Sequence, residues 1–268
     1  MPVQIEAHVA YTFEEPTDFL LQMEAAEIPE QKLEGPGLTL SESEHRADVV
    51  GADMIGSRSW LRCQGDFTAD YKITATIQRQ LVDLERLKSL PPHQLPGETV
   101  PYLFDSRFCP SDRFQGFVES EFRHLSGGER IVAMRDWVHD NFTYTPGASN
   151  ATTTAVDTLV ERRGVCRDYA HVICSLARAS AIPARYVSCY APGVEPPDFH
   201  AVAEVFMDDP ETDGIGAGSW QLVDATGMAG PEHIVKIAVG RDAADVSFLT
   251  SYGLATFKDK QITVTETA

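Results

Sequence analysis

Three residues in the second half of the chain have the side chains that nucleophilic catalysis by a thiol requires. Cys166 stands where an amphipathic helix is predicted to begin, and His200 and Asp224 lie at or near the ends of predicted strands. A cysteine nucleophile needs a base to take or share its proton, and an imidazole is suited to this near neutral pH. The imidazole needs a carboxylate at its far nitrogen, which fixes the tautomer and stabilises the cation. These residues predict attack of a thiolate on a carbonyl carbon.

The position of Cys166 favours its thiolate form. Apolar residues recur at helical spacing from Val165 to Ala181, and a short predicted helix before them ends at Gly164. A helix N-terminus carries partial positive charge and unpaired N–H groups, so a thiol there can ionise below its usual pKa of about 8.5. This stretch alone leaves a second interpretation open, namely a buried structural cysteine.

The elements that must position these residues have an α+β order. Helical periodicity in the middle of the chain is followed by strand-like segments at 182–190, 199–206 and 220–224. Adjacent antiparallel strands would bring His200 and Asp224 within reach of each other if their register agrees. We therefore predict a core of helices packed on an antiparallel sheet.

The region before this core has the alternation of apolar and polar residues that is typical of strands. Residues 3–11, 57–63 and 67–77 show it most clearly, and Gln64-Gly65-Asp66 reads as a hairpin turn. We expect a small antiparallel sandwich. A further strand is predicted at 261–265.

A proline-dense segment divides the two compositions. Pro91 to Gly97 can continue neither a helix nor a central strand. We predict a β-rich domain at 1–88, a linker at 89–100 and a catalytic core at 101–268.

Charge and cysteine content limit the partners and the compartment. The 268 residues carry a net charge of -18, which repels nucleic acid phosphates and anionic membrane surfaces, so we expect neither as a partner. The five cysteines form no CxxC pair, and the N-terminus does not resemble a signal peptide. A cytoplasmic protein with reduced thiols is the expectation. Oligomeric state is not predicted.

No motif indicates a metal or a cofactor. The histidines outside the Cys166 region form no pair with metal-ligand spacing, and no phosphate-binding glycine loop is present. Asp208, Asp209 and Asp213 lie close together, but a solvated loop explains them better than calcium binding. We predict no metal site and no cofactor.

Three sequence blocks resemble the transglutaminase-like superfamily, a papain-like group that includes many bacterial proteins of the cysteine protease type. The blocks are Gly164 to His171, His200 to Val205 and Trp220 to Thr226, and they occur in the family's order and spacing. The resemblance covers about residues 100 to 245, and the β-rich region before it is similar in placement to one found in many bacterial members. It implies that Cys166 is the nucleophile, His200 the base and Asp224 the orienting carboxylate.

The oxyanion hole is predicted only in part. The backbone N–H of Cys166 is the natural first donor, because it lies beside the attacking sulfur. The resemblance implies a second donor from an upstream side chain, for which Trp137, Tyr144 and Asn141 remain open.

Two departures from the family's pattern concern substrate specificity more than catalysis. Val202 stands where the family usually has Trp, and Ala225 stands where it often has Pro. Both neighbour residues of the expected site.

The function that follows is hydrolysis of an amide or peptide bond through a thioester acyl-enzyme, with a peptide or protein as substrate. Resemblance to bacterial members favours hydrolysis. Transglutaminase-type acyl transfer to an amine and a non-catalytic protein-binding module on the same fold are the alternatives.

Overall fold

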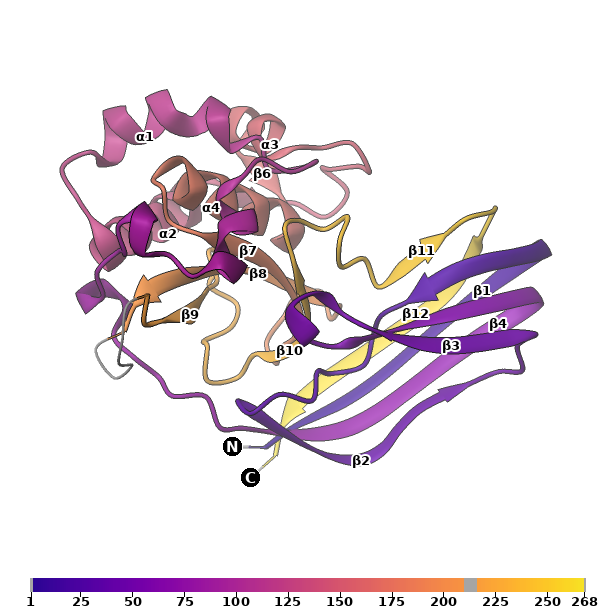
Figure 1. Ribbon diagram of the computed structural model, residues 1–268. Helices are drawn as coiled ribbons and strands as arrows, with labels where there is room; N and C mark the ends of the chain where they lie inside the picture. Colours follow the sequence, from indigo (N-terminus) through magenta and orange to yellow (C-terminus); the bar gives the residue numbers. More distant parts are fainter. Residues whose placement is uncertain (1, 210–215, 268) are drawn as a thin grey trace.

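The computed structural model describes residues 2–209 and 216–267, and it confirms the predicted α+β class (Figure 1). An elongated lobe of β-strands lies beside a lobe in which helices pack on a second antiparallel sheet. We call these the N-terminal lobe and the core lobe.

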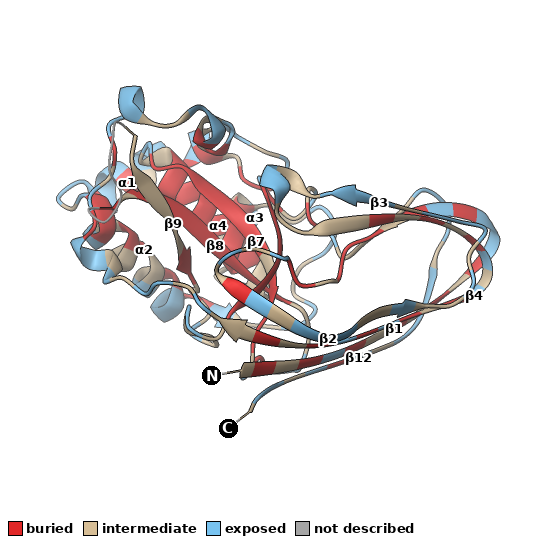
Figure 2. Ribbon diagram, turned by 60° about the horizontal axis from the view of Figure 1, so that its bottom comes forward, coloured by how far each residue is buried: buried red, intermediate tan, exposed pale blue. Residues whose placement is uncertain are grey.

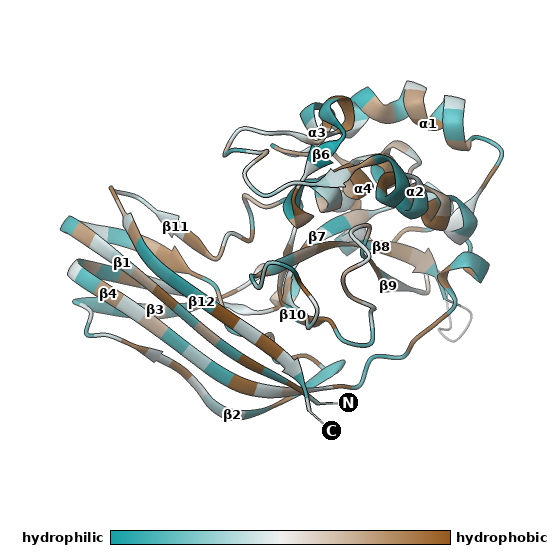
Figure 3. Cartoon of the chain, turned by 180° about the vertical axis from the view of Figure 1, so that it is seen from behind, coloured by the Kyte–Doolittle hydropathy of each residue, from teal (hydrophilic) through white to brown (hydrophobic). Residues whose placement is uncertain are grey.

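The N-terminal lobe is one six-stranded antiparallel sheet built on two long strands. Its strands are β1 (Pro2–Leu21), β2 (Gln31–Leu40), β3 (His45–Val50), β4 (Ser57–Ile77), β11 (Leu249–Ser251) and β12 (Thr256–Glu266). Buried and partly exposed residues alternate along most of β1 and β4, as strands with one covered face require. Hydrophobic and hydrophilic residues alternate along these strands in the same way (Figure 3).

The sheet doubles over on itself at the end farthest from the core lobe (Figure 2). The pairing of β1 with β4 shifts register between Phe13 and Thr17, where the strand bends. Phe13 stacks on Phe19 with ring centroids 4.7 Å apart, and Phe67 meets Phe19 edge-on at 5.0 Å. These aromatic contacts fill the inside of the bend in the sheet.

The last strands of the chain belong to the N-terminal lobe. The segment predicted at 261–265 is a strand, but β12 pairs with β1 from Val3 to Thr12, and β11 pairs with the other end of β1. The structure thus moves residues 249–266 out of the predicted core at 101–268. The physical reason is that β1 needs a partner on its second edge, and local patterning does not say which distant strand supplies it.

The core lobe contains the helices and a four-stranded sheet of order β10-β7-β8-β9. Its longer elements are α1 (Gln115–Phe122), α2 (Gly127–Asn141), α3 (Ala155–Glu161), α4 (Cys166–Ala179), β7 (Ala184–Tyr190), β8 (His200–Asp208), β9 (Gly218–Val223) and β10 (Val235–Gly240). Two short parallel strands, β5 (Thr143–Tyr144) and β6 (Arg163–Gly164), precede α4, and short 3-10 turns lie at 52–54, 84–86, 92–94, 97–103 and 111–114.

Helix α4 is the centre of the core lobe. It packs on β7 and β8, and the helix is buried from Asp168 to Arg178 (Figure 2). A helix enclosed in this way is fixed by its packing, so its first residue has a defined position.

A buried network of charges joins the two lobes. Glu204 of β8 is fully buried and bonds to Arg185 and Lys236, and these cations also bond to Asp53 and Glu30 of the N-terminal lobe. Burial alone would raise the pKa of Glu204, but Arg185 and Lys236 lower it to about 2. The lobes are thus held together by fully paired charges.

His171 of α4 is buried between the rings of Phe108 and Tyr186, at 5.3 Å and 5.2 Å. Its Nε2 accepts a hydrogen bond from the N–H of Ala243. Burial lowers the pKa of His171 to about 3, and the Arg167 charge acts in the same direction. The ring is therefore neutral in the folded protein near neutral pH.

This neutral ring predicts an acid-sensitive contribution to stability. Between pH 6.5 and 3 the unfolded chain binds a proton at His171 that the folded chain does not, so stability falls as pH falls. From pH 7 to 5 this residue should cost about 2 kcal/mol of unfolding free energy. Urea unfolding at both pH values should show that His171→Gln lacks this loss, whatever its stability at pH 7. An equal pH dependence in both proteins would contradict the assignment.

Candidate active site

Cys166 is the first residue of α4, and the carboxylate of Asp168 fixes the turn that presents it. Asp168 is fully buried. Its carboxylate accepts a hydrogen bond from the N–H of Val165 at 2.9 Å and another from the Arg167 guanidinium at 2.9 Å. A Cβ atom at Gly164 would come within 2.7 Å of the Asp168 Cβ and 2.8 Å of its Oδ2, which explains the glycine. Cys166 is partly exposed, whereas the other four cysteines are buried.

His200 and Asp224 come together as the antiparallel register of β8 and β9 requires. His200 begins β8 and Asp224 follows β9 directly, with Ala203 opposite Val223. The Nε2 atom of His200 lies 2.9 Å from Oδ2 of Asp224, and both side chains are almost completely buried. This pairing is strong because it is shielded from water.

Asp224 is held by its own loop. Its Oδ1 accepts hydrogen bonds from the N–H and the hydroxyl of Thr226, and its Oδ2 accepts one from the N–H of Ala229. The pKa of Asp224 is lowered despite its burial, because it bonds to His200 and to Thr226. The carboxylate is thus ionised and fixed in orientation. Sequence reasoning did not identify Thr226 as its partner, although a Thr two residues after an Asp is a known turn signal.

The side chains of His200 and Cys166 lie close enough to interact. Burial disfavours the imidazolium, but the bond to Asp224 and the contact with Cys166 outweigh it and raise the pKa of His200 to about 10. The Nδ1 atom is buried and has no hydrogen-bond partner in residues 2–209 and 216–267. This nitrogen is free to exchange a proton with the thiol, while Nε2 is occupied by Asp224.

Of the three side chains considered for the oxyanion hole, the structure brings Tyr144 to Cys166. Burial raises the pKa of the Tyr144 hydroxyl, and negative charge on Cys166 raises it further; the hydroxyl also interacts with the Cys166 backbone. It remains a protonated donor near neutral pH. Trp137 instead packs under the Arg162 guanidinium at 4.3 Å, and Asn141 donates to the carbonyl of Trp137.

The two departures from the family's pattern are both buried, and they follow His200 and Asp224 closely in the sequence. Val202 is buried in a small apolar cluster that includes Val187 and Leu222. Ala225 is also buried, and its carbonyl lies 3.3 Å from Nδ1 of His139. Neither displaces a group that could react.

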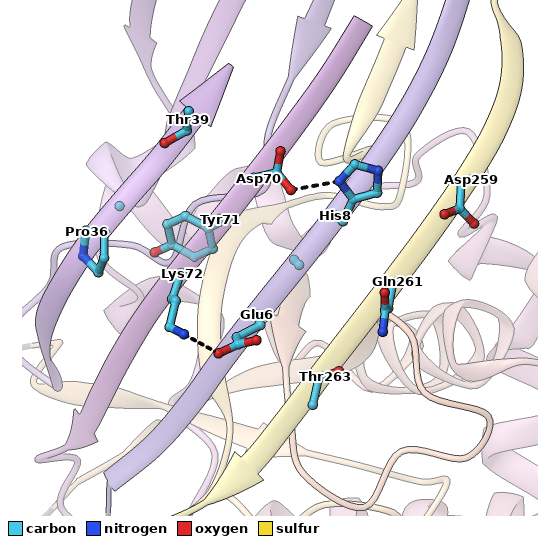
Figure 4. Close-up of a pocket in the computed structure, with 12 residues that line it drawn as sticks. Glu6, His8, Pro36, Thr39, Asp70, Tyr71, Lys72, Asp259, Gln261 and Thr263 are labelled. Atoms are coloured by element: carbon cyan, nitrogen blue, oxygen red, sulfur yellow. Dashed lines mark hydrogen bonds and ion pairs between the residues drawn. The ribbon is translucent and has the colours of Figure 1, made fainter. Parts of the chain in front are cut away.

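Other candidate centres are weaker. In the part of the chain that the structure describes, no three His, Cys, Asp or Glu residues are grouped to hold a metal ion, and no helix is long and apolar enough to cross a bilayer. Asp213, which the calcium alternative invoked, lies outside the described residues. A hollow of about 600 Å³ lies on the outer face of the N-terminal sheet (Figure 4). Its Glu6–Lys72 and His8–Asp70 pairs satisfy one another, so we assign it no ligand.

An α+β fold with a cysteine at a helix start, a histidine at the start of a strand of the adjoining sheet and a carboxylate bonded to that histidine is a papain-like arrangement. The family model of the transglutaminase-like superfamily matches residues 118–225, a span that includes Cys166, His200 and Asp224. The chain belongs to this superfamily, and its fold is of the thiol hydrolase and acyltransferase type.

The chain is also similar to individual proteins, and a solved structure supports the assignment. A crystal structure named as a "putative cysteine protease" from Cytophaga hutchinsonii is 31% identical, with a TM-score of 0.90 over 99% of this chain and 90% of that one. The Mycobacterium leprae protein ML0607 is 32% identical over 120 residues, and the Mycobacterium tuberculosis protein Rv2569c is 30% identical over 122. These matches span 42% and 37% of the two mycobacterial proteins.

Proposed function

We propose that this protein is a thiol-dependent hydrolase that cleaves an amide or peptide bond through a Cys166–His200–Asp224 triad. The observation that carries the proposal is the 2.9 Å bond between His200 and Asp224, which leaves Nδ1 of His200 unpartnered beside Cys166. A scaffold would not need an aligned carboxylate, a buried imidazole and an accessible thiol at one helix start.

The first half of the reaction forms a thioester. The Cys166 sulfur attacks the carbonyl carbon, and the resulting oxyanion accepts hydrogen bonds from the Cys166 N–H and the Tyr144 hydroxyl. The proton on Nδ1 of His200 passes to the leaving nitrogen, and the C–N bond breaks. Asp224 holds the ring and stabilises its charged form throughout.

The second half resolves the thioester. Neutral His200 removes a proton from water, which attacks the acyl carbon; the C–S bond breaks and releases a carboxylic acid and the Cys166 thiolate, with the proton left on Nδ1 of His200. A primary amine in place of water would give acyl transfer. The name of the Cytophaga hutchinsonii relative supports hydrolysis.

Unfolded casein, incubated with and without a fluorescent primary amine, tests the proposal. New peptides in the presence of the protein, and none with Cys166→Ala, are expected. Incorporation of the amine without new peptides would replace hydrolysis by acyl transfer. If the wild-type protein neither cleaves casein nor forms a covalent acyl adduct at Cys166 detectable by intact mass, and Cys166 also alkylates like an ordinary thiol, the non-catalytic alternative takes its place.

Tyr144→Phe should lower kcat by about tenfold to a hundredfold with little change in KM, because it removes one oxyanion donor and keeps the ring. The casein assay measures this. Asn141→Ala is the matched control, since its side chain bonds to a backbone carbonyl away from Cys166. Equal losses in both variants, or a loss in KM alone, would contradict the role of Tyr144.

A further inference from the structure

The segment that delivers His200 is held by residues of the N-terminal lobe. Asp198 and Phe199 come directly before His200, in the loop between β7 and β8. Oδ2 of Asp198 accepts a hydrogen bond from Nζ of Lys260 on β12 at 2.5 Å. Oδ1 of the same carboxylate accepts the N–H of Phe199 at 2.7 Å. One carboxylate therefore links β12 to the backbone beside the histidine.

The ring of Phe199 is held on two sides by residues tied to the same lobe. It stacks on Phe248 with centroids 4.9 Å apart and packs against Tyr190 at 5.4 Å. The carbonyl of Phe248 accepts the N–H of Gln22, and the Tyr190 hydroxyl donates to the carbonyl of Met23. Gln22 and Met23 directly follow β1, so both supports of this ring are anchored to the N-terminal sheet.

These contacts lie at the rim of the active site. The charge of Asp198 acts on the Tyr144 hydroxyl, which in turn neighbours Cys166. Lys260 lies on β12, the strand with which the chain returns to the N-terminal sheet. This strand pairs with β1 along Val3–Thr12. The Lys260–Asp198 contact places β12 against the loop that leads into β8, and Figure 1 shows β11 between β1 and the core lobe.

We propose that the N-terminal sheet is a working part of the active site, in which Lys260 and Phe248 position His200 against Cys166. This inference rests on the proposed function and assigns a role to the N-terminal lobe. Lys260 and Phe248 do not touch the reacting atoms; they are positioning residues. The lobes are also joined by the Glu204 network, so the Lys260 contact is not needed to hold them together.

The test is the rate at which iodoacetamide modifies Cys166 at pH 7, measured by peptide mass spectrometry, which requires no known substrate. Lys260→Met should slow modification by about tenfold, since small misplacement of a reacting group is costly. Phe248→Ala should do the same. Lys260→Arg should restore the wild-type rate, and Lys258→Met, on the same strand, should match the wild type. The melting temperature of Lys260→Met should stay near that of the wild type, because a partly exposed ion pair adds little stability.

The outcomes separate this inference from the proposed function. If Lys260→Met and Phe248→Ala both react as fast as the wild type while His200→Ala is slow, the N-terminal sheet does not position His200 and the triad stands. A melting temperature that falls without any change in rate would likewise overturn the inference. If His200→Ala reacts as fast as the wild type, the proposed function fails and the inference fails with it.

Discussion

Asp224→Asn should lower kcat by about a hundredfold to ten-thousandfold while leaving the fold intact. The Asp224 carboxylate accepts a hydrogen bond from Nε2 of His200, which keeps a proton on that nitrogen. An amide can instead present its NH₂ group to this nitrogen, which favours the tautomer that carries its proton on Nδ1. That tautomer cannot accept the thiol proton, and the imidazolium also loses its counter-charge. Both effects act on the same step.

The casein assay measures this loss, with unfolding by urea as a check on stability. In the loop that holds Asp224, the backbone N–H groups of Thr226 and Ala229 donate hydrogen bonds to the carboxylate. In Asp224→Asn, the side-chain amide oxygen can still accept a hydrogen bond from this loop. Asp259→Asn, exposed on β12, is the matched control and should retain wild-type activity. Activity of Asp224→Asn within about threefold of wild type, a difference of less than 1 kcal/mol in the barrier, would remove Asp224 from the triad.

Glu204→Gln should destabilise the protein by about 3–5 kcal/mol at pH 7, because it leaves two buried cations without their shared anion. Arg185 bonds to this carboxylate at 2.7 Å, and Lys236 bonds to its other oxygen. All three side chains are at least 96% buried, so water cannot replace the lost partner. The change should also weaken the junction between the lobes.

The pH dependence of this effect has a definite sign. The pKa of Glu204 is lowered to about 2, so its contribution is present above about pH 4.5 and is lost as pH falls toward 2. The difference between wild type and Glu204→Gln in urea unfolding should therefore shrink below pH 4.5. Glu34→Gln, at an exposed pair with Lys32, should have no measurable effect. If Glu204→Gln and the wild type have the same urea unfolding curve at pH 7, the Glu204 network does not stabilise the fold.

The sequence predicted the core of this molecule because its signals are local. The start of α4 at Cys166 follows from helical periodicity and a preceding glycine. The strand that begins at His200 and the strand that ends just before Asp224 follow from apolar runs. The proximity of His200 and Asp224 was conditional on register, and the β8–β9 pairing supplies that register.

What the sequence could not predict depends on contacts between distant segments. The strand at 261–265 was expected, but its partner β1 lies at the other end of the chain. Glu204 stands in an apolar strand and would ordinarily face solvent; only the meeting of two lobes encloses it with Arg185 and Lys236. Tyr144 could not be chosen over Trp137 because no local pattern reports which aromatic ring faces Cys166.

The most direct test of the central claim is the rate of iodoacetamide modification of Cys166 as a function of pH, in the wild type and in His200→Ala. The raised pKa of His200 predicts that its ring is an imidazolium through neutral pH, with its positive charge close to the Cys166 sulfur. Cys166 should therefore react rapidly near pH 6, where an ordinary thiol with a pKa of about 8.5 is almost fully protonated. His200→Ala should lose this advantage. Ordinary thiol behaviour in both proteins would contradict the thiolate–imidazolium pair and, with it, the proposed enzyme.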